Sequence, residues 1–360
     1  MSWLHWSIVT TFLWTIQNSS MYYFTNIASM NAMAVNTFSR GIGIVCMICY
    51  ILISGLSSQI RKNIVINIFF TDIFFIIVSS ILMLLGNIFL YMSYSKMPHY
   101  QNASVATGIS NICIIISTLL SYFFLNGTLS FSSGFGVIMC FIALSIATTG
   151  WDITKVFSRT DRKVKNKGDD KRHDDKRHDD KKWGEHDDHE AAHHTKYENS
   201  TWTTYALYSA VFYGFGMFST LALAKYGIKL NSLSSSIMII FIEFVIGILI
   251  YLLFTNKHIV KTYSLKKYGL HNYSHDLERL VSNKKFILNG ILNGICEAFG
   301  LFGLINSYKS VSNGGMVDAI TGGYAIIQAL LLYAIYNTSL NMSTIVGLVT
   351  QCIGVYFIQK

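Results

Sequence analysis

The sequence predicts an all-α polytopic membrane protein with ten transmembrane helices, arranged as two inverted five-helix repeats. Three observations carry this prediction: an apolar composition, a series of long apolar runs, and an internal duplication. Hydrophobic residues make up 52% of the 360 residues, charged residues make up 13%, and the mean hydropathy is +0.41. Soluble domains carry about 25% charged residues. The composition therefore indicates a chain embedded in lipid.

The long apolar runs are predicted to be helices, because a backbone in lipid must satisfy its own amides within a helix or a closed barrel. Apolar residues are continuous rather than alternating in these runs, which favours helices over barrel strands. Each run is close to the ~20 residues that cross a bilayer. The ten predicted helices are 3–24, 33–54, 71–94, 104–125, 131–152, 202–224, 232–254, 286–308, 315–336 and 341–358.

The internal duplication relates segment 87–150 to segment 302–360. A shift of 211 positions aligns the polar turn at 126–129 with the turn at 337–340, and each turn separates two apolar runs. Self-similarity of this kind indicates a repeated structural unit. Because each half then holds an odd number of spans, the halves must enter the membrane from opposite sides, which makes the repeat an inverted one.

The predicted domains are a first repeat over 1–154, a charged linker over 155–200 and a second repeat over 201–360. The linker has low hydrophobicity, dense charge and a tandem pentamer, KRHDD at 171–175 and 176–180. Such a segment cannot bury enough apolar surface to fold, so the linker is predicted to be disordered. All six cysteines fall inside apolar runs, where they act as small hydrophobic residues.

The linker also interleaves histidines with aspartates, a composition that binds divalent zinc, copper or nickel through imidazole and carboxylate groups. No HExxH pair and no Cys/His finger spacing is present, so such binding would be weak and nonspecific. A low-complexity expansion in an Asn- and Lys-rich chain is the favoured explanation for the tract. The candidate metal ligands are His173, His178, His186, His189, His193 and His194.

The net charge of +9 does not predict nucleic-acid binding, because the basic residues lie in loops between helices without interleaved aromatic residues. Lipid headgroups are the expected partner of these residues.

No glycine-rich phosphate loop, Walker motif or membrane-protease motif is present, so the sequence predicts neither an enzyme nor an ATP-driven pump. The helix count and the duplication argue against a seven-helix receptor, and a channel or scaffold is kept as an alternative.

Four features of the sequence are the segment Tyr91–Ala106, the segment Ser121–Gly150, its second copy Leu332–Phe357, and Arg40 in the run NTFSRGIGIV. In these features the chain resembles the drug/metabolite transporter superfamily, in its EamA-like ten-helix branch. Two departures stand out. The acidic residue often found between the fourth and fifth helices is absent from both halves, and the early proline of the fourth and ninth helices is missing, since the single proline is Pro98.

The resemblance implies a secondary active transporter that moves a small organic solute through a central cavity by alternating access. The solute would be a metabolite, an amino acid, a nucleotide sugar or a drug-like compound. The alternative is a divalent metal-ion transporter that collects metal on the His/Asp-rich loop. The expected partners are the solute, the lipid bilayer, and a proton or counter-solute where transport is coupled. No cofactor and no nucleic acid are expected, and a homodimer is also compatible with this interpretation.

Charged side chains at bilayer depth cost at least ~2.5–3.5 kcal/mol on insertion scales, so those present are expected to face the interior of the bundle. The alternative for each is a structural role, such as an ion pair that joins the halves or a helix cap. For neutral polar residues, hydrogen bonds between helices are the commoner use. The candidate substrate-binding or coupling residues are Arg40, Glu243, Glu297, Asp318, Tyr324 and Asn111.

The chain is predicted to be an integral multi-pass protein of the plasma membrane or of an organelle membrane. Its first apolar run has no basic residues before it, so we expect a retained helix rather than a cleaved signal. The resemblance places both termini in the cytosol. The positive-inside rule places them outside, because segments 155–196 and 257–285 hold most of the lysines and arginines. The two indications of orientation disagree.

Overall fold

The computed structural model describes residues 2–56, 70–97, 102–149, 187–226, 231–255, 273–338, 340 and 342–359. Within these ranges the chain is helical and contains no strand. Seven helices are long and apolar enough to cross a membrane, which confirms the predicted all-α membrane class. These seven candidate spans are Ala32–Ile53, Thr71–Lys96, Ser104–Phe124, Thr201–Tyr226, Ser232–Ile250, Lys284–Tyr308 and Gly314–Tyr336.

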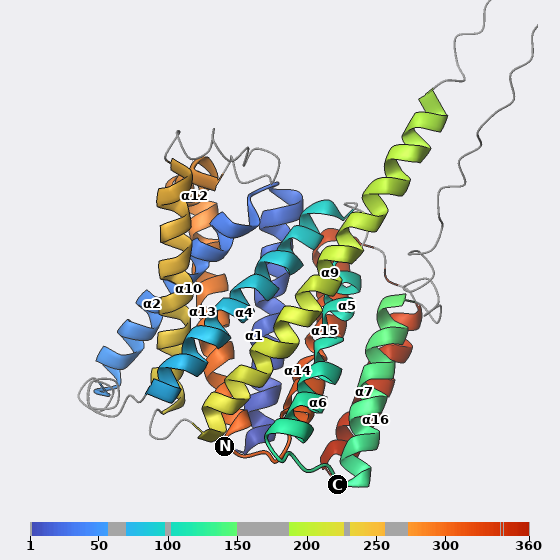
Figure 1. Cartoon of the computed structure of the whole chain (residues 1–360). Helices are drawn as coiled ribbons and strands as arrows, with labels where there is room; N and C mark the ends of the chain where they lie inside the picture. The colour runs from blue at the N-terminus through green and yellow to red at the C-terminus, as the bar shows by residue number, and fades with distance from the viewer. Residues whose placement is uncertain are drawn as a thin grey trace, which may run out of the picture.

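The helices form one elongated bundle (Figure 1). In chain order they are α1 (Trp3–Tyr22), a π-helical turn (Tyr23–Ile27), α2 (Ala32–Ile53), α4 (Phe70–Lys96), α5 (Ser104–Ser110), α6 (Cys113–Phe124), α7 (Phe131–Thr149), α9 (Asp187–Tyr226), α10 (Ser232–Thr255), α12 (Tyr273–Ser282), α13 (Lys284–Tyr308), α14 (Gly314–Thr321), α15 (Tyr324–Tyr336) and α16 (Met342–Gln359).

Three of the ten predicted spans form helices, α1, α7 and α16, that are not among the seven candidate spans. Helix α1 is rich in polar residues, because its buried face is built largely from serine, threonine, glutamine and asparagine. The apolar stretches of α7 and α16 are shorter, at Phe131–Ala143 and Ile345–Ile358. Length and composition alone therefore select seven spans rather than the predicted ten.

Two predicted continuous helices are interrupted at corresponding places. The segment over 104–125 is split between α5 and α6, and the segment over 315–336 is split between α14 and α15. Asn111 lies in the first break and Gly322 in the second, and these positions differ by the same 211 residues that align the duplicated turns (322 − 111 = 211). The two segments therefore share an irregularity of the backbone at positions that the predicted duplication aligns.

The duplicated turns also share a backbone conformation. Asn126 and Asn337, again 211 residues apart (337 − 126 = 211), have left-handed φ values of 50° and 55°. Asparagine adopts this region more readily than other residues with a side chain. Asn337 directly follows α15 and Asn126 lies two residues after α6, so both segments leave their helices through a left-handed asparagine.

The two chain ends lie at the same end of the bundle, where α1 starts and α16 finishes (Figure 1). Helix α9 instead starts at the opposite end and projects beyond its neighbours there. It begins at Asp187, inside the stretch predicted to be a disordered linker. Residues 187–200 contain neither glycine nor proline, so no residue there interrupts the helix. The remainder of the predicted linker, 155–186, lies outside the described residues.

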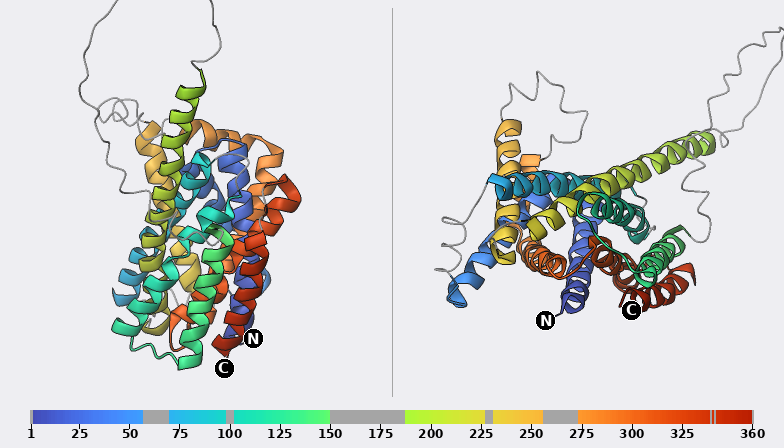
Figure 2. Two further views of the ribbon diagram at one scale, coloured as in Figure 1. Left: turned by 90° about the vertical axis from the view of Figure 1, so that its right-hand side faces the viewer. Right: turned by 60° about the horizontal axis from the view of Figure 1, so that its bottom comes forward.

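Helices α7 and α16 lie side by side at the periphery of the bundle in both views of Figure 2. Two glycines bring their backbones into contact. A Cβ atom on Gly136 would lie 2.6 Å from the carbonyl oxygen of Gly354, and one on Gly354 would lie 2.9 Å from the carbonyl oxygen of Gly136. Small residues at such contacts are typical of membrane helices, where close packing rather than hydrophobic burial holds the helices together.

We expect Gly136→Ala to lower the melting temperature of the detergent-solubilised protein. The free energy of unfolding should fall by about 1–3 kcal/mol, because the added methyl group meets a backbone carbonyl that cannot move aside. Gly134→Ala is the matched control on the same helix, since a Cβ atom there has no neighbour within 4 Å. The control is expected to be neutral, or stabilising by up to ~1 kcal/mol through helix propensity. Equal melting temperatures for the two variants would contradict the proposed packing of α7 on α16.

Candidate functional site

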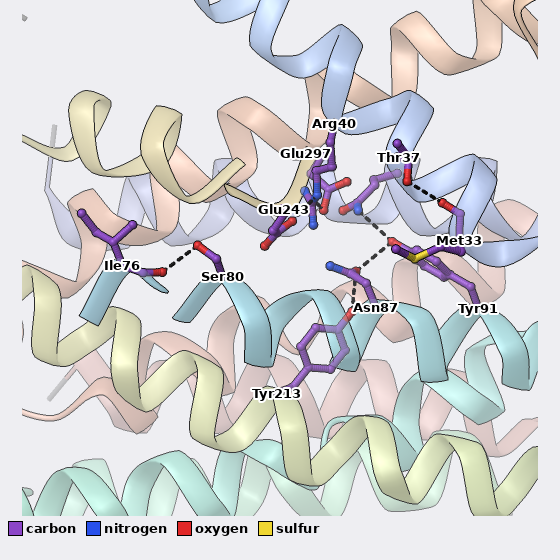
Figure 3. A network of polar contacts seen from close by, with 11 residues as sticks. Met33, Thr37, Arg40, Ile76, Ser80, Asn87, Tyr91, Tyr213, Glu243 and Glu297 are labelled. Carbon is purple, nitrogen blue, oxygen red and sulfur yellow. Dashed lines mark hydrogen bonds and ion pairs between the residues drawn. The ribbon is translucent and has the colours of Figure 1, made fainter. Parts of the chain in front are cut away.

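Arg40 on α2 lies between two carboxylates, Glu243 on α10 and Glu297 on α13 (Figure 3). Its Nε pairs with Oε2 of Glu243, and its Nη1 pairs with Oε1 of Glu297. The three side chains are only 3%, 1% and 8% exposed. We call these residues the charged triad. It unites three of the predicted site residues and ties α2 to two helices from the other half of the chain.

Close contact between α2 and α13 makes the triad possible. Gly43 lies three residues after Arg40, and Gly294 lies three residues before Glu297. A Cβ atom on Gly294 would lie 2.7 Å from the carbonyl oxygen of Ser39 and 2.9 Å from the amide nitrogen of Gly43. Because the two backbones touch, the side chains one turn away are within reach of each other.

The charged triad is not electrically balanced. One guanidinium and two ionised carboxylates sum to a net charge of −1. An uncompensated buried charge costs several kcal/mol unless a proton or another ion neutralises it. The triad is therefore a place where a positive charge or a proton is stabilised.

A cavity lies against the triad inside the bundle. Its walls come from α1, α4, the α5–α6 break, α6, α9, α13 and α15, and every lining residue is buried, so this conformation encloses the space. The cavity is small, so a solute of more than a few atoms requires the helices to separate. The lining residues are Trp14, Gln17, Asn18, Met83, Asn87, Asn111, Cys113, Tyr213, Met217, Glu297 and Tyr324.

Asn87 on α4 organises the polar part of the cavity wall (Figure 3). Its Oδ1 accepts hydrogen bonds from the hydroxyl groups of Tyr91 at 2.9 Å and Tyr213 at 2.7 Å. The Nε2 of Gln17 in turn donates to the Tyr91 hydroxyl at 3.1 Å. This network joins α1, α4 and α9. Hydrogen bonds in a chain strengthen one another, so the network holds the polar groups of the wall in place.

None of the four residues of this network is among the predicted site residues, and for Gln17 and Tyr213 the sequence holds a signal that would have indicated them. Gln17 lies in the middle of the first apolar run, and Tyr213 lies well away from both ends of its helix. A polar group in the middle of a span is the signal that would have identified both, because tyrosines of the interfacial belt lie at span ends.

Asp318 on α14 does not join the charged triad. Its two carboxylate oxygens accept hydrogen bonds from the hydroxyl groups of Tyr308 on α13 and Ser117 on α6. The residue is 1% exposed, and no ion pair to it is found in the described ranges. Asn313, not Asp318, caps α14, since its Oδ1 accepts from the amide of Gly315 at 2.9 Å. The alternative role of Asp318 as a helix cap is therefore wrong.

Asn111 and Tyr324 both line the cavity. Asn111 Nδ2 donates to the carbonyl oxygen of Gly322 at 2.9 Å, so it joins the two interrupted helices at their breaks. Tyr324 packs edge-on against Trp14, with 6.0 Å between ring centroids. Asn111 thus makes a hydrogen bond between helices, which was the alternative to substrate binding for the neutral polar residues. Tyr324 contributes an aromatic side chain to the cavity wall.

The side chains of the histidine candidates lie outside the part of the chain that the structure describes. His173, His178 and His186 lie outside the described residues, and the side chains of His189, His193 and His194 on α9 are not described. Over the described ranges, no group of three or more His, Cys, Asp or Glu side chains is arranged to hold a metal ion.

Comparison with known protein families finds no match to this chain, and comparison with curated proteins finds none either. One solved crystal structure, described only as that of a protein, superposes with a TM-score of 0.63. The superposition covers 99% of this chain and 96% of that chain, at 9% sequence identity. A likeness at this identity shows the fold alone, and the predicted transporter family stays a prediction.

Proposed function

We propose that the chain is a secondary active transporter of a small organic solute, with ten transmembrane helices in two inverted halves. The observation that carries the proposal is the enclosed cavity, because both halves build its walls. The first half contributes α1, α4 and α6, and the second half contributes α9, α13 and α15. A solute site at the interface of two inverted repeats is typical of alternating-access carriers.

The course of the chain supports the ten-span arrangement. Both termini lie at one end of the bundle (Figure 1), which requires an even number of crossings, whereas the seven candidate spans are an odd number. Adding α1, α7 and α16 gives ten (7 + 3 = 10). Helices α1 and α9 start at opposite ends of the bundle, as expected for inverted repeats. The paired helix breaks and paired left-handed asparagines agree with an ancestral duplication.

In the proposed cycle the two halves rock about the cavity and expose it to one side of the membrane at a time. The charged triad joins α2 of one half to α10 and α13 of the other, so it must rearrange as the halves move. Glu297 and Asp318 are two of the buried acids, and a coupled proton would be carried by an acid of this kind. Exchange of a second solute is the alternative form of coupling.

The test is transport by the purified protein in proteoliposomes. A thermal-shift screen of amino acids, nucleotide sugars, phosphorylated sugars and divalent metals first selects the solute, because a ligand that binds only the folded state raises its melting temperature. We expect saturable uptake that is stimulated by unlabelled solute on the opposite side. Linear, unsaturable flux would favour a pore. Deletion of 169–194 is expected to leave uptake intact, whereas loss of metal uptake would favour the metal transporter.

A further inference from the structure

We propose that two gates related by the duplication close the cavity at its two ends, and that a proton on Asp318 controls only the gate nearer the chain termini. This inference rests on the proposed transport function and adds the way in which a proton acts on it. Three observations carry it: contacts between the halves that occur in exchanged pairs, the position of these contacts on either side of the cavity, and the hydrogen bonds of Asp318.

The contacts between the two interrupted helices occur in exchanged pairs. Thr107 Oγ1 on α5 donates to Oε1 of Gln328 on α15 at 2.8 Å. The shift of 211 positions relates Thr107 to Asp318 (107 + 211 = 318). It also relates Ser117 to Gln328 (117 + 211 = 328). The exchanged pair is therefore Ser117 and Asp318, and these two side chains are hydrogen-bonded as well. Each half thus contacts the other half through the same two positions.

A second exchanged pair lies farther from the helix breaks. Asn102 Nδ2 donates to Oγ1 of Thr338 at 2.9 Å. The same shift relates Asn102 to Asn313 (102 + 211 = 313) and Gly127 to Thr338 (127 + 211 = 338). Asn313 and Gly127 also lie against each other, since a Cβ atom on Gly127 would be 3.1 Å from Nδ2 of Asn313. Two separate contacts therefore follow the same exchange.

The hydrogen bond between Asn111 and Gly322 marks the centre of this arrangement, because each residue is the counterpart of the other. The exchanged pairs lie on either side of it. Helix α5 lies on the side away from the chain termini, and α14 lies on the side of the termini (Figure 1). A contact and its counterpart therefore face opposite ends of the bundle, as expected for inverted halves.

The distal gate is the group of Tyr94, Thr107 and Gln328, on the side away from the chain termini. All three side chains are buried, and the hydroxyl groups of Tyr94 and Thr107 share a hydrogen bond of 2.6 Å. The Tyr94 hydroxyl also lies 3.3 Å from Oδ1 of Asn18, which lines the cavity. The distal gate therefore closes the cavity toward this end.

The terminal gate is the group of Tyr308, Asp318 and Ser117, on the side of the chain termini. All three side chains are buried, and both Tyr308 and Ser117 are hydrogen-bonded to Asp318. Ser117 lies one helical turn after Cys113 on α6 (117 − 113 = 4), and Cys113 lines the cavity. The terminal gate therefore closes the cavity toward the other end. It differs from the distal gate in holding an acid where Thr107 stands.

The hydrogen bonds of the terminal gate suit a neutral Asp318. Ser117 Oγ donates to the carbonyl oxygen of Ile114 at 3.2 Å. With its own hydrogen used there, Ser117 can accept a hydrogen bond from a proton on Oδ2 of Asp318. Oδ1 of Asp318 accepts from Tyr308. Each side-chain oxygen of the closed gate then has a partner, so the closed gate is stable while Asp318 carries a proton.

The surroundings of Asp318 offer no charge to balance its ionised form. Helices α1, α6, α7 and α16, which contact α14, contain no lysine, arginine, aspartate or glutamate. Lys225 at the end of α9 donates to a backbone carbonyl oxygen. On α13, Glu297 lies 11 residues before Tyr308 (308 − 297 = 11), about 16 Å along the helix axis. The titratable groups that face Asp318 are Tyr308 and Cys113, and both types stay neutral near pH 7.

Loss of the proton from Asp318 therefore opens the terminal gate. A buried carboxylate without a cation requires water, and water reaches this one when the gate separates. The proton leaves to the solution on that side, so opening toward the chain termini becomes more favourable as pH rises. The distal gate holds only hydroxyl and amide groups, which keep their protonation state over the same range. Its own groups therefore give it no dependence on pH.

The experiment measures access to Cys113, which lines the cavity, in the full-length protein reconstituted in proteoliposomes. A membrane-impermeant sulfonated maleimide is added outside, and labelling of Cys113 is measured by peptide mass spectrometry. A protease-cleavable C-terminal tag distinguishes molecules whose termini face outward from those whose termini face inward. Each rate is divided by the rate in Asp318→Asn at the same pH and orientation, so that titration of the thiol itself cancels.

In molecules with outward-facing termini, we expect this ratio to rise with pH by up to about tenfold per unit, because opening releases one proton. In molecules with inward-facing termini, the reagent enters through the distal gate, so the ratio should stay constant or fall. A ratio that does not rise in the first orientation, or that rises equally in both, would overturn the proposal.

Thr107→Asp is the matched variant, because it places an acid at the position of the distal gate that the duplication relates to Asp318. We expect access to Cys113 in molecules with inward-facing termini to become dependent on pH. The melting temperature shows whether each variant is folded. A folded Thr107→Asp protein without this new dependence would contradict the gate. If Thr107→Asp does not fold, the comparison of the unaltered protein with Asp318→Asn decides by itself.

Transport separates this proposal from the one on which it rests. Saturable, counter-solute-stimulated uptake, together with labelling of Cys113 that is the same in Asp318→Asn and in the unaltered protein, would overturn the proton-controlled gate and leave the transporter standing. Labelling that depends on pH from one side only, together with linear flux in proteoliposomes, would leave the gate standing and overturn the transporter.

Discussion

Arg40→Met will lower the free energy of unfolding by about 3–5 kcal/mol, because the substitution leaves two buried carboxylates facing each other without their cation. The measurement is the melting temperature and the monodisperse yield of the detergent-solubilised protein. Arg279→Met is the matched control. Arg279 is exposed on α12 and has a cation–π contact with Phe286, with 5.6 Å from its guanidinium carbon to the ring centroid, so its loss should cost no more than ~1 kcal/mol.

The cause of that instability is tested by neutralising the remaining carboxylates. In the background of Arg40→Met, the added changes Glu243→Gln and Glu297→Gln remove both unpaired charges at nearly constant volume. We expect the triple variant to recover most of the lost stability, because replacing a whole buried ionic cluster is often close to neutral. It should not transport. A triple variant that transports normally would show that the charges of the triad have no part in the cycle.

The inward position of the triad was predictable, but its pairing was not. Charged residues within apolar runs are costly in lipid, which places Arg40, Glu243 and Glu297 inside the bundle from sequence alone. Which of them meet depends on the contact between α2 and α13, where Gly43 and Gly294 allow the backbones to touch. No periodicity of either helix specifies that contact, since the two segments are far apart in the chain.

The helix breaks were missed for a similar reason. The predicted helices over 104–125 and 315–336 are apolar enough to be read as continuous, and only the second contains a glycine pair. In the structure both are interrupted, and Asn111 at one break donates to Gly322 at the other. A hydrogen bond between segments stabilises this irregularity, so local propensity does not reveal it. The left-handed turns were predictable in kind, because asparagine and glycine at 126–127 are common turn residues.

Asp318→Asn is expected to reduce transport by about 10²-fold or more, or to uncouple it from a proton gradient, while the protein stays folded. The expected size of this reduction in transport is the usual contribution of a positioned proton-transfer group. Asparagine has nearly the same shape and still accepts a hydrogen bond from Ser117 or Tyr308, so the packing around Asp318 survives and the loss of the ionisable group is the main change. The melting temperature is therefore expected to move by no more than a few degrees, on the order of 1 kcal/mol.

Tyr308→Phe distinguishes a proton carrier from a structural hydrogen bond at this position. The variant removes one of the two hydroxyl donors but leaves the Asp318 carboxyl group and its bond from Ser117. If Asp318 carries the proton, Tyr308→Phe will keep uptake sensitive to a pH gradient, whereas Asp318→Asn will lose that sensitivity. If both variants lose uptake to the same extent, and the residual uptake of neither responds to a pH gradient, the role of Asp318 is to hold α6, α13 and α14 together. Kinetics unchanged from those of the unaltered protein in Asp318→Asn would exclude it from coupling altogether.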